Sequence, residues 1–282
     1  MRATLAVILA RGLGTRLRVD DGAMLTDAQR VAAETGAKGL MPVSGRPFLD
    51  HVLHELAEGG VRDVVFVIAP DDDAIRKRYD DVAAPTRLRV RYAIQTEARG
   101  TADALLAARA AVEAPAGAPR DKAGARHFLV CNSDNLYPVE SVKALVELDG
   151  PGLIAYDSAG LTEDAAIDDA RVRRFALLDL GPDDTLRDLA EKPEADHPLA
   201  VASERWVSMN LWRFTDEIFD DCAAVTPSMR GELELSAAVR HAVRERGARF
   251  RAVRQRVAVP DLSHRRDVAA LEARLADRVP RP

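Results

Sequence analysis

The sequence has little of several features that would define a class of protein. It contains only two cysteines, Cys131 and Cys222, which lie far apart and outside any Cys-x-x-Cys pair. This excludes a disulfide scaffold and a structural zinc site. The chain has no apolar run of the roughly 20 residues that a membrane-spanning helix needs, and no charged and then apolar leader at its start. We therefore expect a cytoplasmic protein with no membrane partner.

Net positive charge and lysine are also scarce. The 40 basic residues are outnumbered by 45 acidic ones, which gives a formal charge of −5. The chain thus lacks the positive excess that neutralises a nucleic-acid backbone, so we expect a small-molecule partner and no nucleic acid. Only five of the basic residues are lysines, and each of them stands out in a chain that otherwise uses arginine.

Strand and helix patterns alternate along the first half of the chain. The run Thr4–Ala10, TLAVILA, is apolar without a helical period, which is typical of a strand buried on both faces. Further strands are expected at Asp63–Ala69, Leu88–Ile94 and His127–Asn132, and helices at Pro47–Leu56, Asp72–Tyr79 and Thr101–Val112. This alternation predicts a three-layer α/β fold with a mostly parallel central sheet.

The alternation loosens beyond about Gly150. Strands are expected at 173–180 and 206–214, an edge strand at Phe250–Val259, and helices at Glu232–Arg246 and Arg265–Arg278. Because these strands lack covering helices of their own, we expect them to extend the first sheet. The expected edge strand carries arginines at positions 249, 251, 254 and 256. Such charges usually prevent edge-to-edge aggregation, and a regulatory anion site is the alternative.

Two connecting segments have recognisable patterns. The segment Arg18–Ala37 contains a small helix of its own, in which Thr26 to Gln29 fits a capping box and Gly36 fits a C-terminal cap. A flap is one role open to this segment. The stretch Ala114–Ala125 is rich in Pro, Gly and Ala and is expected to be a loop.

A glycine-containing loop, Ala10–Leu17, follows the first strand directly. Gly12 and Gly14 allow backbone N–H groups to approach an anion, and Arg16 adds a forked cationic donor that suits phosphate. The dinucleotide fingerprint needs a third glycine at Leu17, and the ATPase phosphate loop needs Gly-Lys-Ser/Thr, so neither pattern is present. Taken alone, the loop also fits a plain glycine turn.

Six motifs in chain order resemble the sugar-1-phosphate nucleotidylyltransferases. That family has L-A-x-G-x-G-T-R-L and then K-x-L-x-P-V-x-G-x-P, which match Ala10–Leu17 and Lys38–Pro47 here. The other four motifs are Gln95–Ala102, Ser133–Tyr137, Glu191–Pro193 and Pro227–Glu234. The resemblance implies one Rossmann-like nucleotidyltransferase domain over residues 1–282, with a nucleotide-binding half at about 1–150 and a sugar-binding half at about 151–282.

The resemblance also implies the reaction. An oxygen of a sugar-1-phosphate, or of a cyclitol phosphate, attacks the α-phosphorus of a nucleoside triphosphate, and pyrophosphate leaves. Positioning and charge neutralisation matter more here than proton transfer, so the lack of a catalytic histidine constellation is no objection. A non-catalytic sensor that binds a nucleotide sugar on the same fold is the alternative, and a homo-oligomer stays open.

Individual roles follow from the matched motifs. Arg16 and Lys38 would hold the triphosphate and stabilise the leaving pyrophosphate, and Asp134 would bind Mg²⁺. The nucleotide would contact Ala10, Gly12, Gly14, Thr15, Gln95, Gly100 and Thr101. The sugar phosphate would contact Glu191, Lys192, Asn210 and Ala176. Without the resemblance, Lys38 also fits a solvated loop charge, Asp134 a helix cap, and the Glu191–Lys192 pair a surface ion pair.

The nucleobase stays open at this point. Gln95 lies five residues before Gly100, the spacing at which relatives that use UTP or dTTP contact the base, and a glutamine amide can donate to O4 and accept from N3–H. This favours UTP or dTTP slightly. The segments Gly100–Ala104 and Ser208–Met209, however, resemble the adenylyl branch of the family.

The sequence departs from the family pattern at three positions. Asn210 and Ala176 stand where relatives have glycine, and Ala176 is expected to crowd the sugar. Ala237 stands where the family pattern that follows Glu234 leads us to expect a second magnesium carboxylate. A helix turns about 100° per residue, so Glu232 and Glu234 would not point in the direction of position 237. We therefore expect Asp134 to be the only certain protein ligand of the metal.

Overall fold

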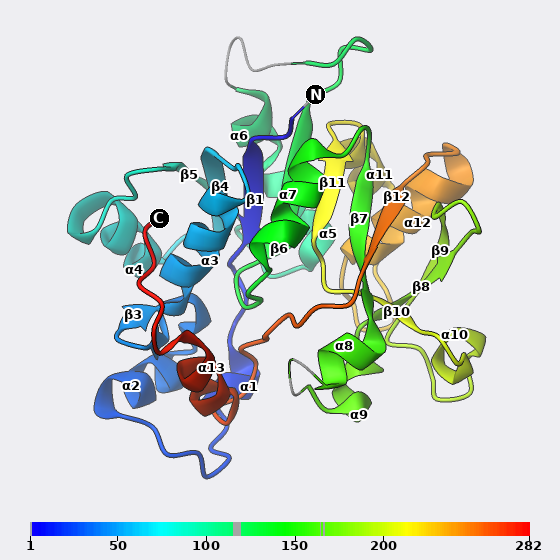
Figure 1. The fold of residues 1–282 in the computed structure, drawn as a ribbon. Helices are drawn as coiled ribbons and strands as arrows, with labels where there is room; N and C mark the ends of the chain where they lie inside the picture. The colour runs from blue at the N-terminus through cyan, green and yellow to red at the C-terminus, as the bar shows by residue number, and fades with distance from the viewer. Residues whose placement is uncertain (1, 115–119, 164, 166) are drawn as a thin grey trace.

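The computed structural model describes residues 2–114, 120–163, 165 and 167–282. Within these residues the centre is one twisted sheet of ten strands in the order β5-β4-β1-β6-β11-β7-β10-β8-β9, with β12 beside β7 (Figure 1). The strands are β1 Leu5–Leu9, β4 Asp63–Ile68, β5 Arg89–Ile94, β6 His127–Asn132, β7 Gly152–Asp157, β8 Ala176–Leu180, β9 Leu186–Glu191, β10 Trp206–Ser208, β11 Trp212–Thr215 and β12 Arg251–Gln255. A two-stranded hairpin joins β2 Pro42–Val43 and β3 Arg46–Pro47.

Parallel and antiparallel pairing divide the sheet. β5, β4, β1 and β6 are parallel, with β1 between β4 and β6. β11 then joins β6 in antiparallel pairing, so the second half of the chain continues the first sheet as expected. In that half β12 is parallel to β7, whereas β7, β8, β9, β10 and β11 otherwise pair antiparallel.

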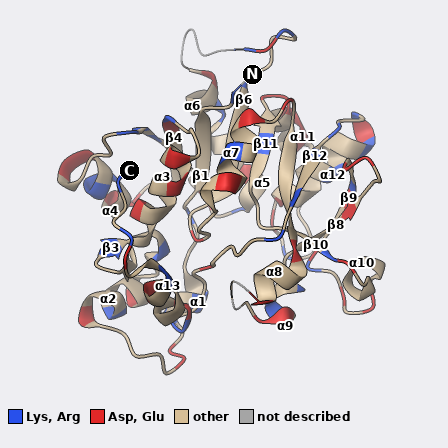
Figure 2. Cartoon of the chain, viewed as in Figure 1, with Lys and Arg blue, Asp and Glu red and all other residues tan. Residues whose placement is uncertain are grey.

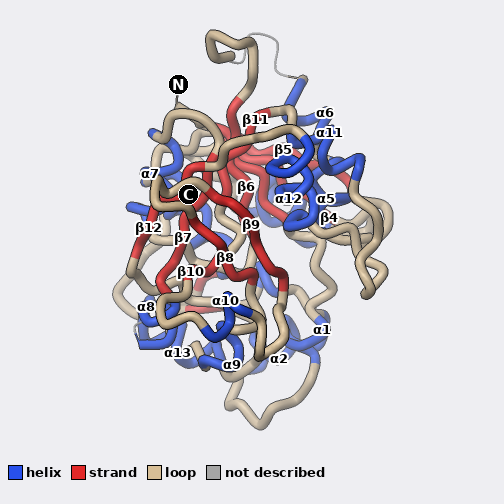
Figure 3. The backbone as a smooth tube through the Cα atoms, turned by 90° about the vertical axis from the view of Figure 1, so that its right-hand side faces the viewer, coloured by secondary structure: helices blue, strands red, loops and turns tan. Residues whose placement is uncertain are grey.

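The sheet is covered on both faces, which makes the predicted three layers. Side chains alternate along β1. Ala6 and Ile8 enter the core under α3 (Phe48–Glu58) and α7 (Val139–Glu147), whereas Val7 enters the core under α5 (Thr101–Ala107), α11 (Ile218–Ala224) and α12 (Leu235–Glu245). Figure 3 shows α7 on one side of the strands and α5, α11 and α12 on the other. Burial of each large apolar side chain contributes about 1.5–3 kcal/mol, so strands that are apolar on both faces need both layers.

The helices cover the sheet and its edges. They are α1 Thr15–Arg18, α2 Asp27–Thr35, α3 Phe48–Glu58, α4 Asp73–Arg76, α5 Thr101–Ala107, α6 Arg109–Glu113, α7 Val139–Glu147, α8 Ser158–Glu163, α9 Asp169–Val172, α10 Pro198–Val201, α11 Ile218–Ala224, α12 Leu235–Glu245 and α13 Asp267–Leu275. A 3₁₀ turn spans Lys38–Leu40, and a π-helical turn spans Lys77–Val82. None of the described helices is long and apolar enough to cross a membrane.

Several expected elements are divided in the structure. The helix expected at Asp72–Tyr79 is a short α4 followed by the π-helical turn, and the helix expected at Thr101–Val112 is split into α5 and α6 at Ala108. The prediction of a single strand at 206–214 is wrong. It is two strands, β10 and β11, because Asn210 between them has a left-handed backbone with φ of 59°.

The predicted connecting segments are present where the structure describes them. Thr26 and Gln29 form the capping box of α2, and Gly36 ends that helix with φ of 74°. Gln29 also donates to Pro42 O at 3.1 Å and to Glu272 at 2.8 Å, which anchors α2. The flap role of this segment stays a prediction. Of the loop expected at Ala114–Ala125, residues 115–119 lie outside the described residues.

Three of the four arginines around β12 are held by acidic residues. Arg249 pairs with Asp183 at 2.9 Å and Arg254 with Asp184 at 2.7 Å. Arg256 likewise pairs with Glu163 at 2.6 Å. Figure 2 shows acidic and basic residues interspersed around β12. This pairing favours the interpretation as a charged edge strand over a regulatory anion site.

Candidate active site

The candidate site lies at the carboxyl ends of the parallel strands, where open α/β sheets bind ligands. Ala10 follows β1, Gln95 follows β5, and Ser133 and Asp134 follow β6. Backbone bonds fix these exits side by side: Ser133 N donates to Leu9 O at 3.3 Å, and Ala10 N donates to Val67 O at 2.9 Å. The topology thus brings the motifs Ala10–Leu17, Gln95–Ala102 and Ser133–Tyr137 to one edge of the sheet.

The glycine loop is shaped by close contact with the segment that carries Lys38. Gly14 has φ of 60° and directly precedes α1, and a Cβ at this position would lie 2.2 Å from Gly36 O. Only glycine fits there. Gly12, Thr15 and Arg16 are exposed. Arg16 has no hydrogen bond or ion pair within the described part of the chain. Its guanidinium group is therefore accessible to a ligand.

Lys38 and Asp134, 96 residues apart in the sequence, form an ion pair. The Nζ atom of Lys38 lies 2.8 Å from Oδ2 of Asp134, and the two side chains are only 12% and 22% exposed. The structure therefore disfavours two of the simpler interpretations, because Lys38 is not a solvated loop charge and Asp134 caps no helix among the described residues.

A second carboxylate, which the sequence analysis missed, lies beside this pair. Asp261 forms an isolated β-bridge with Asn135, and Leu262 N donates to Asp134 O at 2.8 Å. Burial and the neighbouring charge of Asp134 raise the pKa of Asp261 to about 6, while Arg171 and Lys38 act in the opposite direction. A signal was present in the sequence, because Asp261 comes two residues after the expected edge strand, as Asp134 comes two residues after β6.

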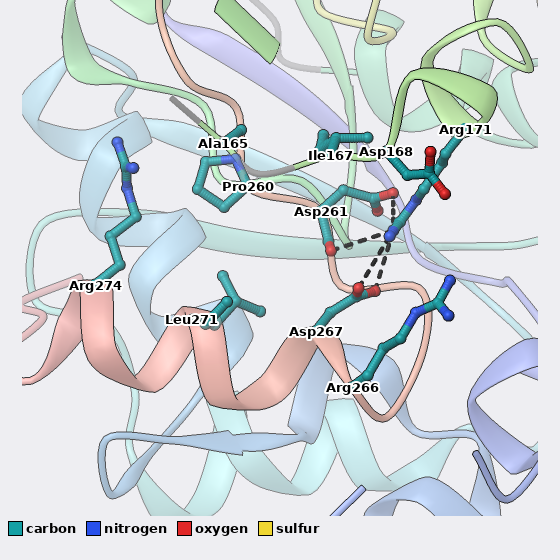
Figure 4. Close-up of a pocket in the computed structure, with 11 residues that line it drawn as sticks. Ala165, Ile167, Asp168, Arg171, Pro260, Asp261, Arg266, Asp267, Leu271 and Arg274 are labelled. Atoms are coloured by element: carbon teal, nitrogen blue, oxygen red, sulfur yellow. Dashed lines mark hydrogen bonds and ion pairs between the residues drawn. The ribbon is translucent and has the colours of Figure 1, made fainter. Parts of the chain in front are cut away.

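Arg171 also contacts Asp261. Its guanidinium donates to the Asp261 carboxylate, and to Oδ1 of Asp267 at 2.9 Å (Figure 4). Asp267 also accepts the backbone N–H groups of Ser263 and His264 at 2.8 and 2.7 Å. Arg171, Asp261 and Asp267 line part of a cavity of about 360 Å³ between α9 and α13.

Arg171→Met should therefore destabilise the protein, and more strongly at pH 8 than at pH 5. The variant leaves a buried carboxylate unpaired, and breaking a buried pair costs about 3–5 kcal/mol. Losing Arg171 raises the folded-state pKa of Asp261 further above its value in the unfolded chain. The destabilisation consequently grows as the pH rises through that pKa and is complete above it. Urea unfolding at the two pH values measures the difference, and equal losses would contradict a role for Asp261.

Gln95 is buried and its amide nitrogen is already used. The side chain is 4% exposed, and Nε2 donates to Gly100 O at 3.1 Å and to Asp103 Oδ2 at 2.8 Å. The backbone oxygen of Gln95 accepts from Arg11 Nε at 3.2 Å, which ties the glycine loop to this segment. In this arrangement the amide oxygen can accept a hydrogen bond from a nucleobase, but both N–H groups of the amide are already used.

The Gly100–Thr101 turn is packed against the segment before α12. Gly100 has φ of 121°, and a Cβ there would lie 2.4 Å from Leu233 O. Ala102 N donates to Leu233 O, and Leu235 N donates to the Thr101 hydroxyl, both at 2.8 Å. The second and last thirds of the chain are thereby joined beside the candidate base site.

The residues assigned to the sugar phosphate come together on neighbouring strands. Ala176 in β8 lies in register with Glu191 in β9 on one side and with Ser208 in β10 on the other. Tyr137, which follows Asp134, donates its hydroxyl to Met209 O at 2.7 Å. This bond links the candidate sugar residues to the end of β6.

Asn210 fits its position because it tolerates a left-handed backbone, as does the glycine of relatives. Its N–H donates to Ser208 Oγ at 3.2 Å, and its Oδ1 accepts the indole N–H of Trp212 at 3.3 Å. Trp212 itself is a core residue, 1% exposed, as expected. The Asn210 amide nitrogen makes no hydrogen bond within the described residues and is therefore available to a ligand.

Glu191 lies close to a second acidic residue. Burial, and then the charge of Glu234, raise the pKa of Glu191. Glu234 in turn forms an ion pair with Arg230 at 2.6 Å. Lys192 follows with a left-handed backbone, φ 45°, and an exposed side chain. The Glu191–Lys192 motif therefore combines a partly buried carboxylate with an accessible ammonium group.

The carboxylate near Asp134 comes from a different part of the chain than position 237. Ala237 lies in the first turn of α12, the helix that packs on β9, α11 and α5. The carboxylate beside Asp134 comes instead from the segment after β12, at Asp261. The sequence argument attached the second carboxylate to the motif that contains Glu234, which faces Glu191.

Comparison with known proteins identifies relatives over most of the chain. The family described as nucleotidyl transferase matches residues 5–257. A UTP–glucose-1-phosphate uridylyltransferase of Haloferax volcanii is 28% identical over 237 residues, which cover 83% of this chain and 81% of that protein. A glucose-1-phosphate thymidylyltransferase of Streptomyces griseus is 29% identical over 83% of this chain, but this covers only 56% of that protein. The chain also spans 46% of the bifunctional protein GlmU of Methanococcus vannielii at 23% identity.

Solved structures agree in fold. A UDP-glucose pyrophosphorylase, solved with UDP-glucose, superposes with a TM-score of 0.71 at 15% identity and covers 98% of this chain and 100% of that one. A putative glucose-1-phosphate thymidylyltransferase from Bacillus anthracis gives a TM-score of 0.69 at 18% identity, over 97% and 96% of the two chains. The expected fold class is confirmed.

Proposed function

Because the chain belongs to the nucleotidyl transferase family, we propose that it transfers a nucleoside monophosphate from a nucleoside triphosphate to a sugar-1-phosphate or cyclitol phosphate. The products are the nucleoside-diphosphate sugar and pyrophosphate. The observation that carries the proposal is the Lys38–Asp134 pair. We assign Lys38 to a phosphate of the nucleotide and Asp134 to the metal, and the pair lies at the sheet edge where the glycine loop begins.

The chain's own residues act mainly by positioning. The backbone of Ala10–Thr15 contacts the triphosphate, and Arg16 and Lys38 neutralise charge that builds on the departing pyrophosphate. Glu191 accepts hydrogen bonds from sugar hydroxyls, and Lys192 pairs with the sugar phosphate. Such preorganised charges need no proton transfer from the protein.

Magnesium fits the carboxylates at this edge. Magnesium commonly uses one or two protein carboxylates and completes its coordination with water and substrate phosphates. Asp134 and Asp261 lie on adjacent backbone segments, and the charge of Asp134 helps to raise the pKa of Asp261. No group of three or more metal-binding side chains is found among the described residues. When bound, the ion would supply positive charge to the phosphates. Asp134 and Asp261 would hold it, and Lys38 would then be free to contact phosphate.

UTP or dTTP should be used in preference to purine triphosphates. A site built around the Gln95 amide leaves buried polar groups unmatched when a purine enters, at a cost of about 1–3 kcal/mol for each unmatched group. Steady-state kcat/KM for UTP, dTTP, ATP and GTP, with one sugar phosphate, measures this preference. Equal or better use of ATP or GTP would instead support the resemblance of Gly100–Ala104 to the adenylyl branch.

Pyrophosphate release tests the proposed function directly. The experiment uses five triphosphates against a panel of sugar and cyclitol phosphates with magnesium, followed by the reverse reaction. Release with at least one pair supports the transferase. Binding of a nucleotide sugar by calorimetry, with no release from any pair, would instead support the sensor.

Two further parts of the proposal concern the chain as a whole. We assign nucleotide binding to residues of about 1–150 and sugar-phosphate binding to those of about 151–282. We place the protein in the cytoplasm. Its oligomeric state is left open, and light scattering of the purified protein would determine it.

A further inference from the structure

The orientation of the Gln95 amide is fixed by the chemistry of its partners. Its nitrogen faces the carbonyl oxygen of Gly100 and the carboxylate of Asp103. Asp103 is also paired with Arg99, at 2.9 Å between Nη2 and Oδ1. Neither a backbone carbonyl nor a carboxylate can donate a hydrogen bond. Turning the amide by 180° would place its oxygen against two acceptors, so the nitrogen must face them.

The amide oxygen of Gln95 points away from these partners. It makes no hydrogen bond within the described part of the chain, and it is not completely buried. Since the residue as a whole is only 4% exposed, this oxygen is on the small part of the side chain that a ligand can reach. It lies at the carboxyl end of β5, beside the loop that Arg11 ties to Gln95.

We propose that Asp103 is a specificity-determining residue that acts through Gln95. By keeping the amide nitrogen turned inward, Asp103 leaves only an acceptor for the nucleobase. A uracil or thymine ring then donates its N3–H to this oxygen, whereas cytosine carries a lone pair on the same ring nitrogen and is rejected. The inference rests on the proposed function, and it adds a residue that does not touch the base.

The contribution of Asp103 differs from that of Gly100, the other acceptor. The Gly100 carbonyl cannot be altered by a side-chain substitution, and it opposes a turn of the Gln95 amide to the same extent in every variant. Asp103 holds the other amide hydrogen, and its Arg99 pair keeps the carboxylate in place. Asparagine has the same size, but its amide can donate as well as accept. It therefore allows the Gln95 amide to turn and to present N–H to the base.

The test compares UTP with CTP in Asp103→Asn. We expect the ratio of kcat/KM for UTP to that for CTP to fall by about tenfold or more, because a site that rejects a base through an unmatched hydrogen bond loses that discrimination when the group can turn. The KM for the sugar phosphate should stay unchanged, which a general loss of structure would not allow. Circular dichroism confirms folding, and Asp103→Ser is the second variant if Asp103→Asn does not fold.

Two controls separate orientation from charge. Glu113→Gln removes the carboxylate of a comparable i,i+4 pair, Arg109–Glu113 on α6, and should leave the ratio unchanged. Arg99→Ala removes the ion pair but keeps the Asp103 carboxylate, and it should keep most of the discrimination. In a Gln95→Ala background, Asp103→Asn should have no further effect on the ratio, because its only route to the base has been removed.

The outcomes distinguish this inference from the proposed function. If wild-type protein discriminates between UTP and CTP and folded Asp103→Asn keeps the same ratio, the role of Asp103 is overturned. If wild-type protein releases no pyrophosphate from any triphosphate, the transferase proposal fails. The ratio of UTP and CTP dissociation constants, measured by calorimetry on the same variants, then tests Asp103 independently, and an unchanged ratio would again overturn it.

Discussion

Lys38→Ala should lower kcat by roughly 10²–10³-fold, as removal of a single preorganised electrostatic group does in other enzymes. The Lys38 side chain is 12% exposed and lies 2.8 Å from Asp134, so its charge acts at short range in a site partly shielded from water. An interaction that strengthens as charge builds on the leaving group changes kcat more than KM. Steady-state kinetics with varied triphosphate measure both constants.

Lys192→Ala is the informative comparison for Lys38→Ala. Lys192 is exposed and adjoins Glu191, so its loss should raise the KM for the sugar phosphate more than the KM for the triphosphate. Lys143→Ala, an exposed lysine on α7, is the control and should behave as wild type. Lys38→Arg keeps the charge but not the compact ammonium group, and should recover only part of the rate. Wild-type kinetics for both Lys38→Ala and Lys192→Ala would refute the assignment of this site.

The first half of the fold could be predicted because local pattern and final packing agree there. Strands such as β1 and β4 are apolar on both faces and lie between helices on both sides, so their burial is visible in the sequence itself. The second half was harder, because β7 pairs with β11 and β12, which come much later in the chain. The helix α7 was missed although Val142, Leu145 and Val146 recur at helical spacing on its buried face. The break between β10 and β11 depends on one backbone angle, at Asn210.

The same contrast applies to the site. Lys38 and Asp134 were found through motifs, and the structure adds the direct contact between them. Asp261 was missed because its position depends on the route of the chain after β12, which returns to pair with Asn135. The inward-facing nitrogen of Gln95 was missed for a related reason, since it depends on Asp103, eight residues away on α5. Motifs identify the residue types, but these partners are set by tertiary structure.

Asp134→Asn and Asp261→Asn should each lower kcat by roughly 10²–10³-fold and raise the magnesium concentration for half-maximal activity. Each variant keeps the size of the side chain but removes one of the two adjacent charges that would hold the ion. Since both carboxylates serve one ion, the double variant should be far less impaired than the product of the two single effects. The activity measurement is paired with Mn²⁺ binding in the presence of a triphosphate, followed by electron paramagnetic resonance, which does not depend on turnover.

Ala237→Asp distinguishes the assignment of Asp261 as the second magnesium carboxylate from the position that the sequence pattern suggested, residue 237. Residue 237 lies on α12, away from the bridge between Asn135 and Asp261. A new carboxylate there should therefore leave the magnesium requirement unchanged. A clear fall in that requirement would restore position 237 as part of the metal site. If instead Asp261→Asn kept both its turnover and its affinity for Mn²⁺, Asp261 would serve only the structural network with Arg171 and Asp267, and Asp134 would hold the ion as the single protein carboxylate.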